Sequence, residues 1–529
     1  MKTVSISLLA LLAASSVANA TPAGCTAAPS GYTNLWYVDP INGSDAGAGT
    51  QASPWKTLQT VLTTKVAYST YKLPYVPLSA LLPPSPKAVV QPGDAILLLD
   101  GDHGSINVRN AHNAGYVTIT SAPGAHPTLH SFAVLGGSYW AVTGLNVQSL
   151  LTDVPVSPQL LSAAANGYWG PLHDITYSGN TLSSASSATT VGWTSADWRA
   201  KEISGVSIAA GSKFPDGTID FNGVLNGTCF TVDNNVISNV NFGIGLTGAD
   251  KASVSWNKIK RYAGDGIDFS ASDLDIIGND IVDSIYTGNA GAVHRDGMQG
   301  QPYWGEQTWN HDVRIIGNRI VAMEDPKLEK PGCLQGISVY NGKWKNILAE
   351  NNFVVINIYN GLVVAGADGL TLVNNTVLSA ADPKACHVGA DAIDNVAGAA
   401  GPNTNAVLAA GSAWIGVLDG IPGNPTKGAV VRNNIASSYN LSATINPIVW
   451  DHNIVAGKQT HIYISKLPYA QPTFIDPAKL FTHFDPEAYA YDATLSAGSP
   501  AIGAATMDGA PLLDINGLTR TTDSGAYRH

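Results

Sequence analysis

A short segment between Gly291 and Trp304 gathers several chemically useful side chains in a chain of which only 13% is charged. Within six positions it holds an imidazole, a guanidinium, a carboxylate and an amide, at His294, Arg295, Asp296 and Gln299. An imidazole titrates near neutral pH, and a guanidinium stays charged and binds carboxylates through paired hydrogen bonds. These residue types predict acid–base chemistry on an acidic substrate.

A recurring phrase shows how the chain positions this segment. Each copy is a turn residue followed by a short apolar strand, and the copies lie at Asn180, Asn235, Asn257, Asn279, Asn318, Asn352, Asn375, Asn433 and around His452. The two steps from Asn235 to Asn279 are 22 residues each, which is the length of one turn of a parallel β-helix. Asn suits a stacked position because its amide bonds to the Asn above and below and because it tolerates a left-handed bend.

A second phrase, typified by Asp265-Gly266-Ile267-Asp268, precedes these asparagines and sets a register between coils. Its third residue is apolar in every copy and should point inward, so strand alternation turns the fourth outward. The predicted outward row is Ser207, Gly245, Asp268, Gln299, Ser338 and Val363. The first residues form a second row, Ser204, Phe242, Asp265, Asp296, Gln335 and Asn360, which a bend at the strand start can re-aim outward. Asp265 and Asp296 are therefore expected about 5 Å apart in a polar groove.

The two ends of the chain carry a family resemblance. The opening "LWYVDPINGSDAGAGTQASPWKTLQTVL", the following "GDAILLLDGDHGSI" and the closing "LSAGSPAIGAATMDGAPLLDINGLTRTTDSGAYRH" are similar to segments of secreted right-handed β-helix proteins of the pectate-lyase-like superfamily. The resemblance implies an all-β, right-handed parallel β-helix (solenoid) with an N-terminal helical cap and long loop insertions. It does not specify chemistry, because this fold hosts lyases, hydrolases, epimerases and non-catalytic surface proteins.

The expected organisation follows from these phrases. Residues 1–20 have the apolar run and small-residue end of a signal peptide cleaved after Ala20, which predicts a secreted or periplasmic protein. We assign 21–88 to the N-terminal cap and a Pro-rich loop, 89–460 to the β-helix with insertions that include 382–428, and 461–529 to a closing segment.

Charge and cysteine content limit the partners and leave one question open. The net charge of −11, without acidic or basic runs, argues against nucleic acid, and no later apolar run is long enough to span a membrane. We expect a monomer. The four cysteines, Cys25, Cys229, Cys333 and Cys386, are compatible with two disulfides or with buried free thiols, and their spacing does not decide the pairing.

The leading functional hypothesis is β-elimination in an acidic, uronate-containing polysaccharide, as in the lyases that the chain resembles. Arg295 would neutralise the uronate carboxylate, and His294, oriented by Asp296, would remove the proton. Lys260 is an alternative base, and Tyr340 would protonate the leaving oxygen. Residues expected to bind substrate are Asp268, Gln299, Arg261, Tyr262, Tyr303, Trp304, Gln335 and Ser338.

A calcium site is possible, and two further hypotheses about the function remain open. Asp265, Asp268 and Asp296 offer hard oxygen ligands on adjacent coils, and these are the ligands that calcium prefers. The "DGID" phrase also resembles one in β-helix polygalacturonases, so Asp265 or Asp268 paired with Asp296 would serve an inverting glycoside hydrolase. The third hypothesis is a carbohydrate-binding surface protein without catalysis.

Overall fold

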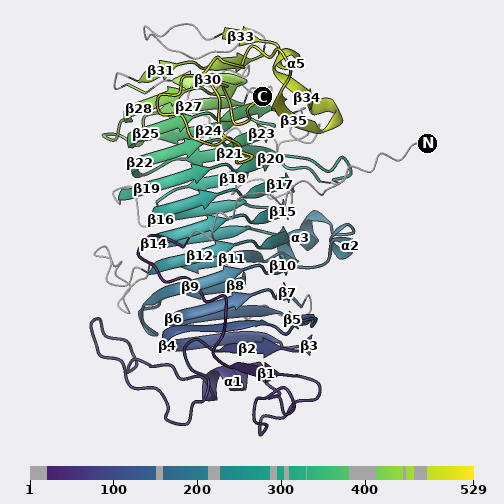
Figure 1. Cartoon of the computed structure of the whole chain (residues 1–529), viewed down its shortest axis with the longest axis vertical. Helices are drawn as coiled ribbons and strands as arrows, with labels where there is room; N and C mark the ends of the chain where they lie inside the picture. Colours follow the sequence, from purple (N-terminus) through teal and green to yellow (C-terminus); the bar gives the residue numbers. More distant parts are fainter. Residues whose placement is uncertain are drawn as a thin grey trace, which may run out of the picture.

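The structure is a computed structural model that describes residues 21–150, 159–211, 227–285, 295–302, 309–328, 330–380, 413–441, 443–444, 448–457 and 473–529. Its strands stack as successive coils along one long axis, as Figure 1 shows. Every described pairing within the two large sheets is parallel, and each strand pairs with the equivalent strand of the next coil. The predicted parallel β-helix is confirmed.

Each coil contributes strands to three faces. Face 1 is formed by β8 (Gln159–Ala164), β11 (Ser204–Ala209), β18 (Arg295–Gly300), β21 (Leu334–Val339), β24 (Asn360–Ala365), β27 (Trp414–Leu418) and β30 (Ser438–Leu441). Face 2 is formed by β1 (Leu35–Val38), β2 (Ala95–Leu98), β9 (Leu172–Ser178), β12 (Thr228–Asp233), β19 (Trp309–Ile316), β22 (Lys343–Glu350), β25 (Ala367–Val373), β28 (Lys427–Arg432) and β31 (Val449–Asp451). Four long strands run through both faces and join them into one sheet: β4 (Ser105–Ser121), β6 (Ser131–Thr143), β14 (Ile244–Ser255) and β16 (Ile267–Ile277).

Face 3 is a separate sheet of shorter strands. Its members are β3 (Gly101–Asp102), β5 (Pro127–Leu129), β7 (Asn146–Gln148), β10 (Thr181–Ser183), β13 (Val236–Val240), β15 (Lys258–Tyr262), β17 (Asp280–Ser284), β20 (Arg319–Val321), β23 (Phe353–Ile356), β26 (Thr376–Ser379), β29 (Ile435–Ala436), β32 (Ile454–Ala456) and β33 (Thr473–Ile475). The core lies between the three faces. The third residues of the repeated phrase, Val206, Ile244, Ile267, Met298, Ile337 and Leu362, are all fully buried there, as predicted.

An unbroken ladder of buried asparagines runs along the corner between faces 2 and 3. The side-chain Nδ2 of each donates to Oδ1 of the next at 2.9–3.1 Å, through Asn180, Asn235, Asn257, Asn279, Asn318, Asn352, Asn375, Asn434 and Asn453. The predicted ladder is confirmed, with two corrections of position. Its last two members are Asn434 and Asn453, not Asn433 and His452, because the ladder residue is the one directly before the apolar strand.

The left-handed bend at this corner belongs to the residue before each ladder asparagine. That residue has φ between 54° and 65° in every coil of the ladder, whether it is a glycine such as Gly278 or a larger residue such as Trp256. The sequence-based expectation that the stacked asparagine itself adopts this conformation was therefore wrong. The two positions have different roles. The residue before the asparagine bends the chain, so the asparagine itself can direct its amide along the axis of the solenoid.

Short helices and an antiparallel strand pair near the C-terminus complete the described secondary structure. The helix α1 (Leu58–Thr64) follows β1 and buries three apolar side chains in the core, while α2 (Ser187–Thr190) and α3 (Ser195–Lys201) lie in the insertion after β10. Near the C-terminus, α5 (Pro477–Leu480) precedes the antiparallel pair β34 (Phe481–Asp485) and β35 (Ala490–Leu495), which flank the 3-10 helix η3 (Pro486–Ala488).

The structure answers part of the question whether the cysteines form disulfides or are free thiols. Cys25 and Cys229 form a disulfide that ties the N-terminal segment to β12, 204 residues away. Cys333 is also disulfide-bonded, to a partner outside the described residues, so no described cysteine is a free thiol. Within the described part of the chain, no helix is long and apolar enough to cross a membrane.

Candidate functional site

The two rows predicted from the repeated phrases exist on face 1. Strand register joins the outward row coil by coil, from Ser207 through Gly245, Asp268, Gln299 and Ser338 to Val363. In the other row, Asp296 pairs with Gln335, and backbone hydrogen bonds link the Asp265 and Asp296 positions of neighbouring coils. The carboxylate-bearing positions are therefore vertical neighbours, as predicted.

Side-chain hydrogen bonds show that most of the second row also turns outward. Gln299 Nε2 donates to Asp296 Oδ2 at 3.1 Å, and Ser338 Oγ donates to Gln335 Oε1 at 3.3 Å. Asn360 Nδ2 donates to the same Gln335 oxygen at 2.7 Å. The two rows thus lie side by side and are joined by hydrogen bonds in two places. We call the polar side chains of these rows the polar strip, which consists of Asp268, Asp296, Gln299, Gln335, Ser338 and Asn360.

The Asp265 carboxylate has a different role. Its Oδ1 accepts the backbone N–H of Asp296 at 2.8 Å, and the residue is only 2% exposed. It therefore anchors the start of β18 from the coil before and sets the position of Asp296.

Most of the polar strip is buried, which differs from the open groove that was expected. Asp296 and Ser338 are fully buried, and Gln299, Gln335 and Asn360 are at most 7% exposed. Asp268 is the exception, since its side chain is only partly buried. Among the strip carboxylates, Asp268 is therefore the one that a substrate can reach.

Burial changes the protonation of these groups. Burial first, and then the charge of Asp296, raise the pKa of Asp268 to about 6. The same two causes raise the pKa of Asp265 well above its usual range. Tyr340, whose backbone N–H bonds to Gly300 at the end of β18, also has a raised pKa because of burial and, next, Asp296. The site therefore combines a carboxyl group that titrates close to neutrality with a phenol that stays protonated.

The predicted cationic residues do not face this strip. Arg295 is 2% exposed, and its Nε donates to the carbonyl oxygen of Ile285 at 2.8 Å. Its side chain packs so closely on Gly332 that a Cβ there would lie 3.1 Å from Arg295 Cδ. The arginine is thus part of the wall at the start of β18, and its predicted role as an exposed clamp finds no support.

The residues of β15 also lie elsewhere. Lys260 Nζ is 3.2 Å from Asp283 Oδ2, and Arg261 Nε donates to Asn239 Oδ1 at 2.9 Å, both on face 3. Tyr262 is fully buried in the core, so it does not contact a polymer. Lys260 and Arg261 were expected to flank the groove but make their contacts on face 3. Tyr262 lies closer to the site, since burial and then the charges of Asp265 and Asp296 raise its pKa. His294, Tyr303 and Trp304 lie outside the described residues.

Tyr359 is a residue near the strip that the sequence did not single out. It is partly buried, and burial and then the charge of Asp296 raise its pKa. Its ring lies 5.1 Å from that of Trp414, at the edge of the strip beside Asn360. The available signal was an aromatic residue directly before the repeated phrase that begins at Asn360.

The predicted calcium ligands are not arranged around one point. Among the described residues, one group of three or more His, Cys, Asp or Glu side chains has all its ligand atoms within 4.8 Å, and this group is Asp273, His311 and Asp312. Asp265, Asp268 and Asp296 do not form such a group, and oxygens of Asp265 and Asp296 already accept hydrogen bonds. The site residues therefore do not fit the predicted calcium ion.

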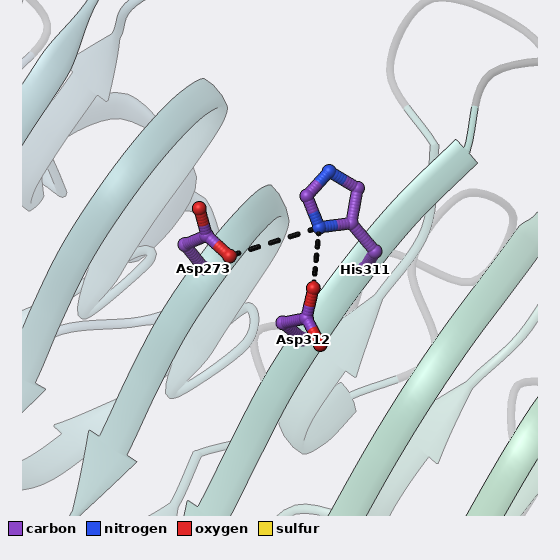
Figure 2. Close-up of side chains that lie close together, drawn as sticks. All are labelled: Asp273, His311 and Asp312. Atoms are coloured by element: carbon purple, nitrogen blue, oxygen red, sulfur yellow. Dashed lines mark hydrogen bonds and ion pairs between the residues drawn. The ribbon is translucent and has the colours of Figure 1, made fainter.

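The group of three lies on face 2. Figure 2 shows the imidazole of His311 between two carboxylates from neighbouring strands, with Nδ1 at 2.8 Å from Asp312 Oδ2 and 3.7 Å from Asp273 Oδ1. All three side chains are 40–51% exposed. Asp273 and Asp312 border a hollow of about 830 Å³ that Thr21, Pro22 and Ala23 of the N-terminal segment also line.

Comparison with known proteins supports the fold. Residues 174–377 match the model of the right handed beta helix region. This chain is a right-handed parallel β-helix. The resemblance predicted from the sequence is thereby confirmed at the level of architecture, and no curated protein matches the sequence closely enough to count as a relative.

Solved structures similar to this β-helix include several carbohydrate-active proteins. A pectate lyase is 12% identical over 94% of this chain and 97% of its own, with a TM-score of 0.37. The A-module of a mannuronan C-5 epimerase from Azotobacter vinelandii is 13% identical over 72% and 88%, with a TM-score of 0.43. A rhamnogalacturonan lyase is 13% identical over 90% and 97%, with a TM-score of 0.34. Such distant likeness concerns the fold and assigns no reaction to this chain.

Proposed function

We propose that this β-helix is a secreted enzyme that cleaves glycosidic bonds in a polysaccharide, with Asp268 and Asp296 as its acid–base pair. The observation that carries the proposal is the accessible carboxyl of Asp268, whose pKa of about 6 results from burial and from the neighbouring Asp296. A pair of carboxyl groups with unequal environments is the arrangement that glycoside hydrolysis requires.

Hydrolysis assigns one role to each member of the pair. Protonated Asp268 donates its proton to the glycosidic oxygen, so that the leaving sugar departs as a neutral alcohol. Ionised Asp296, held by the amide of Gln299, accepts a proton from the water that attacks the anomeric carbon. The net reaction consumes one water and leaves a new reducing end, and the two carboxyl groups exchange their protonation states until solvent restores them.

Residues around the pair supply the surfaces that a sugar chain needs. Tyr359 is the partly exposed aromatic ring beside the strip, with the buried Trp414 behind it, and aromatic rings stack on the apolar faces of sugars. Gln335, Ser338 and Asn360 hold one another by hydrogen bonds, so they keep the adjoining coils rigid rather than rearranging. Gln299 is the positioning residue for Asp296.

A second candidate, β-elimination, is favoured by Tyr340. Its raised pKa keeps the phenol protonated beside Asp296, and a protonated phenol is a suitable donor to a leaving oxygen. In that reaction the reachable Asp268, once ionised, removes the proton next to the uronate carboxylate, and Tyr340 gives its proton to the leaving oxygen. This is the lyase hypothesis of the sequence with a carboxylate as its base.

Product analysis tests the proposal. The purified protein is incubated with alginate, polygalacturonate, xylan and a neutral β-glucan, and both new reducing ends and ultraviolet absorbance near about 235 nm are followed. Reducing ends without absorbance indicate hydrolysis, and both together indicate elimination. Asp268→Asn should remove either signal, with Asp273→Asn on the same strand as the matched control. Equal activity of Asp268→Asn and the wild type would overturn the assignment.

A further inference from the structure

A second cavity lies on face 1 at the first coils of the solenoid. It has a volume of about 330 Å³ and is lined by residues of α1, the segment after it and β4: Gln59, Leu62, Thr63, Tyr68, Asn107, Val108 and Arg109. The amide of Gln59 accepts the Asn107 N–H at 2.8 Å and donates to the Asn107 carbonyl oxygen at 3.0 Å. This double contact fixes α1 against β4, so the cavity is part of the folded framework.

Arg109 gives this cavity a cationic side. The residue is exposed, and its Nε donates to Asn107 Oδ1 at 3.1 Å. Its guanidinium carbon lies 5.5 Å from the ring of Trp169, next to the exposed Tyr168. No described carboxylate pairs with it, although the chain carries 39 acidic and only 28 basic residues. An unpaired guanidinium beside an aromatic ring is suited to an acidic sugar.

Strand register places this cavity in line with Asp268. The outward row of face 1 continues from Asp268 through Gly245, Ser207, Ser162 and Ala133 to Asn107 at the cavity. Five coil steps of about 4.8 Å separate the two ends, a distance of roughly 24 Å. The connecting residues have small side chains or none.

The surface between the two ends is free at Gly245 and more enclosed towards the cavity, where Ser162 and Ala133 are 9% and 5% exposed. A Cβ built on Gly245 would meet no atom within 4 Å, so the space above this position, one coil from Asp268, is free. The neighbouring outward column runs from Arg109 through Leu135, Ala164 and Ala209 to Thr247, so Leu135 is the one large side chain between its ends.

We propose that the cavity at Arg109 is a distal subsite that binds an acidic residue of the polysaccharide whose chain is cut at Asp268. This inference rests on the proposed function for the identity of the polymer. It adds a substrate class, an acidic polysaccharide long enough to span roughly 24 Å, and a positioning role for a region far from the reacting bond. Tyr68 and Trp169 flank the bound sugar, and Arg109 binds its carboxylate.

Affinity electrophoresis tests the subsite directly. The full chain is run in native gels that contain polygalacturonate, alginate or neutral dextran. At least one acidic polymer should retard the wild type, and dextran should not. Arg109→Ala should weaken the apparent affinity at least fivefold, and Arg109→Lys should retain part of it. The matched control is Lys343→Ala on face 2, which removes a cation 5.9 Å from the ring of Trp309 and should change nothing.

Kinetics separate this subsite from the catalytic proposal. With the polymer, Arg109→Ala should raise KM at least fivefold and leave kcat within twofold. With an oligosaccharide too short to reach from Asp268 to the cavity at Arg109, the Arg109→Ala variant should match the wild type. Gly245→Phe places an aromatic ring in the free space above Gly245 on face 1. This variant should impair polymer binding in the same gels.

Each outcome decides between the two proposals. Equal retardation of the wild type and Arg109→Ala, or a wild type that no acidic polymer retards, overturns the distal subsite. Retardation that depends on Arg109 in a protein without any cleavage activity overturns the proposed function and leaves the subsite in place.

Discussion

Two groups of carboxylates on the strand β16 and its neighbours show how strongly environment decides what an aspartate can do. Asp268 and Asp273 are five residues apart on this strand, but Asp268 lies on face 1 and Asp273 on face 2. On face 1, burial and Asp296 raise the pKa of Asp268 to about 6. On face 2, hydrogen bonds from Asn346 and then His311 lower the pKa of Asp312 beside Asp273.

The difference teaches that acid–base capacity on this solenoid does not follow from the number of carboxylates. The face 2 group has more accessible oxygens and a histidine, yet its side chains are 40–51% exposed and solvent compensates their charges. The face 1 pair is less accessible, and because water is excluded one carboxyl keeps its proton near neutral pH. Only the face 1 group is therefore suited to proton transfer.

The largest difference is expected between two single variants, each with one aspartate of β16 replaced by asparagine. Asp268→Asn should lower kcat by about 10²–10⁴-fold, because the general acid is lost without a change in shape. Asp273→Asn should leave kcat within twofold. Reducing-end assays on the best polymer measure both. A comparable loss in the two variants would mean that the face 2 group belongs to the site.

Stability against pH provides the second test. Because its pKa is raised, Asp268 holds its proton more tightly in the folded state than in the unfolded chain. The resulting contribution to the free energy of unfolding is complete below the unfolded pKa of 3.8 and is lost as pH rises through about 6. Asp268→Asn stays neutral throughout. It should therefore stabilise the protein above pH 6, by on the order of 2 kcal/mol, and have little effect near pH 4. Urea unfolding midpoints at both pH values measure the difference, and an equal effect at the two would contradict the shift.

Removal of the donor to Asp296 should have a smaller effect. In Gln299→Ala, the Asp296 carboxylate loses the hydrogen bond from Nε2, so its pKa should rise. We expect kcat to fall about tenfold, equivalent to about 1.4 kcal/mol. The acidic limb of the pH–rate profile should also move to higher pH, which a merely structural role would not cause. An unchanged profile would remove the positioning role of Gln299.

The smallest effect is expected on face 2. The pKa of Asp312 is lower in the folded protein than in the unfolded chain. The ionised Asp312 therefore stabilises the folded protein above the unfolded pKa, and this stabilisation is lost as pH falls through the folded pKa. Because Asp312 is 51% exposed, Asp312→Asn should cost no more than about 0.5 kcal/mol at pH 7. Thermal unfolding in low and high salt measures it. A loss as large as the Asp268 effect would show that exposure does not separate the two groups.

Local patterns in the sequence were sufficient to predict the fold and the register. The asparagine phrase predicted the ladder because each copy pairs a bend with a buried amide, and eight stacked hydrogen bonds make that position costly to vary. The Gly-centred phrase predicted that Asp265 and Asp296 are neighbours. The row at Asn107 was not predicted, because the first coils carry no copy of that phrase.

The direction and burial of individual side chains were less predictable. Strand parity does not decide where a side chain at a bend points, so Asp296 turns outward while Asp265 holds a backbone N–H. Arg295 was expected to neutralise the substrate carboxylate because its guanidinium stays charged, but a carbonyl at Ile285 and the absence of a side chain at Gly332 provide a buried place for it. Such fits depend on residues from other coils. The pairing of Cys25 with Cys229 likewise has no local signal.

That disulfide has a mechanical consequence for the whole solenoid. Stacked repeats ordinarily fray from their ends, since a terminal coil has a neighbour on one side only. Here the chain ahead of the first coil is covalently attached at β12, so the strands from β1 to β11 are enclosed in a loop whose two ends are joined. Peeling them away in sequence is blocked, and under oxidising conditions this part of the molecule should resist pulling and proteolysis as one block.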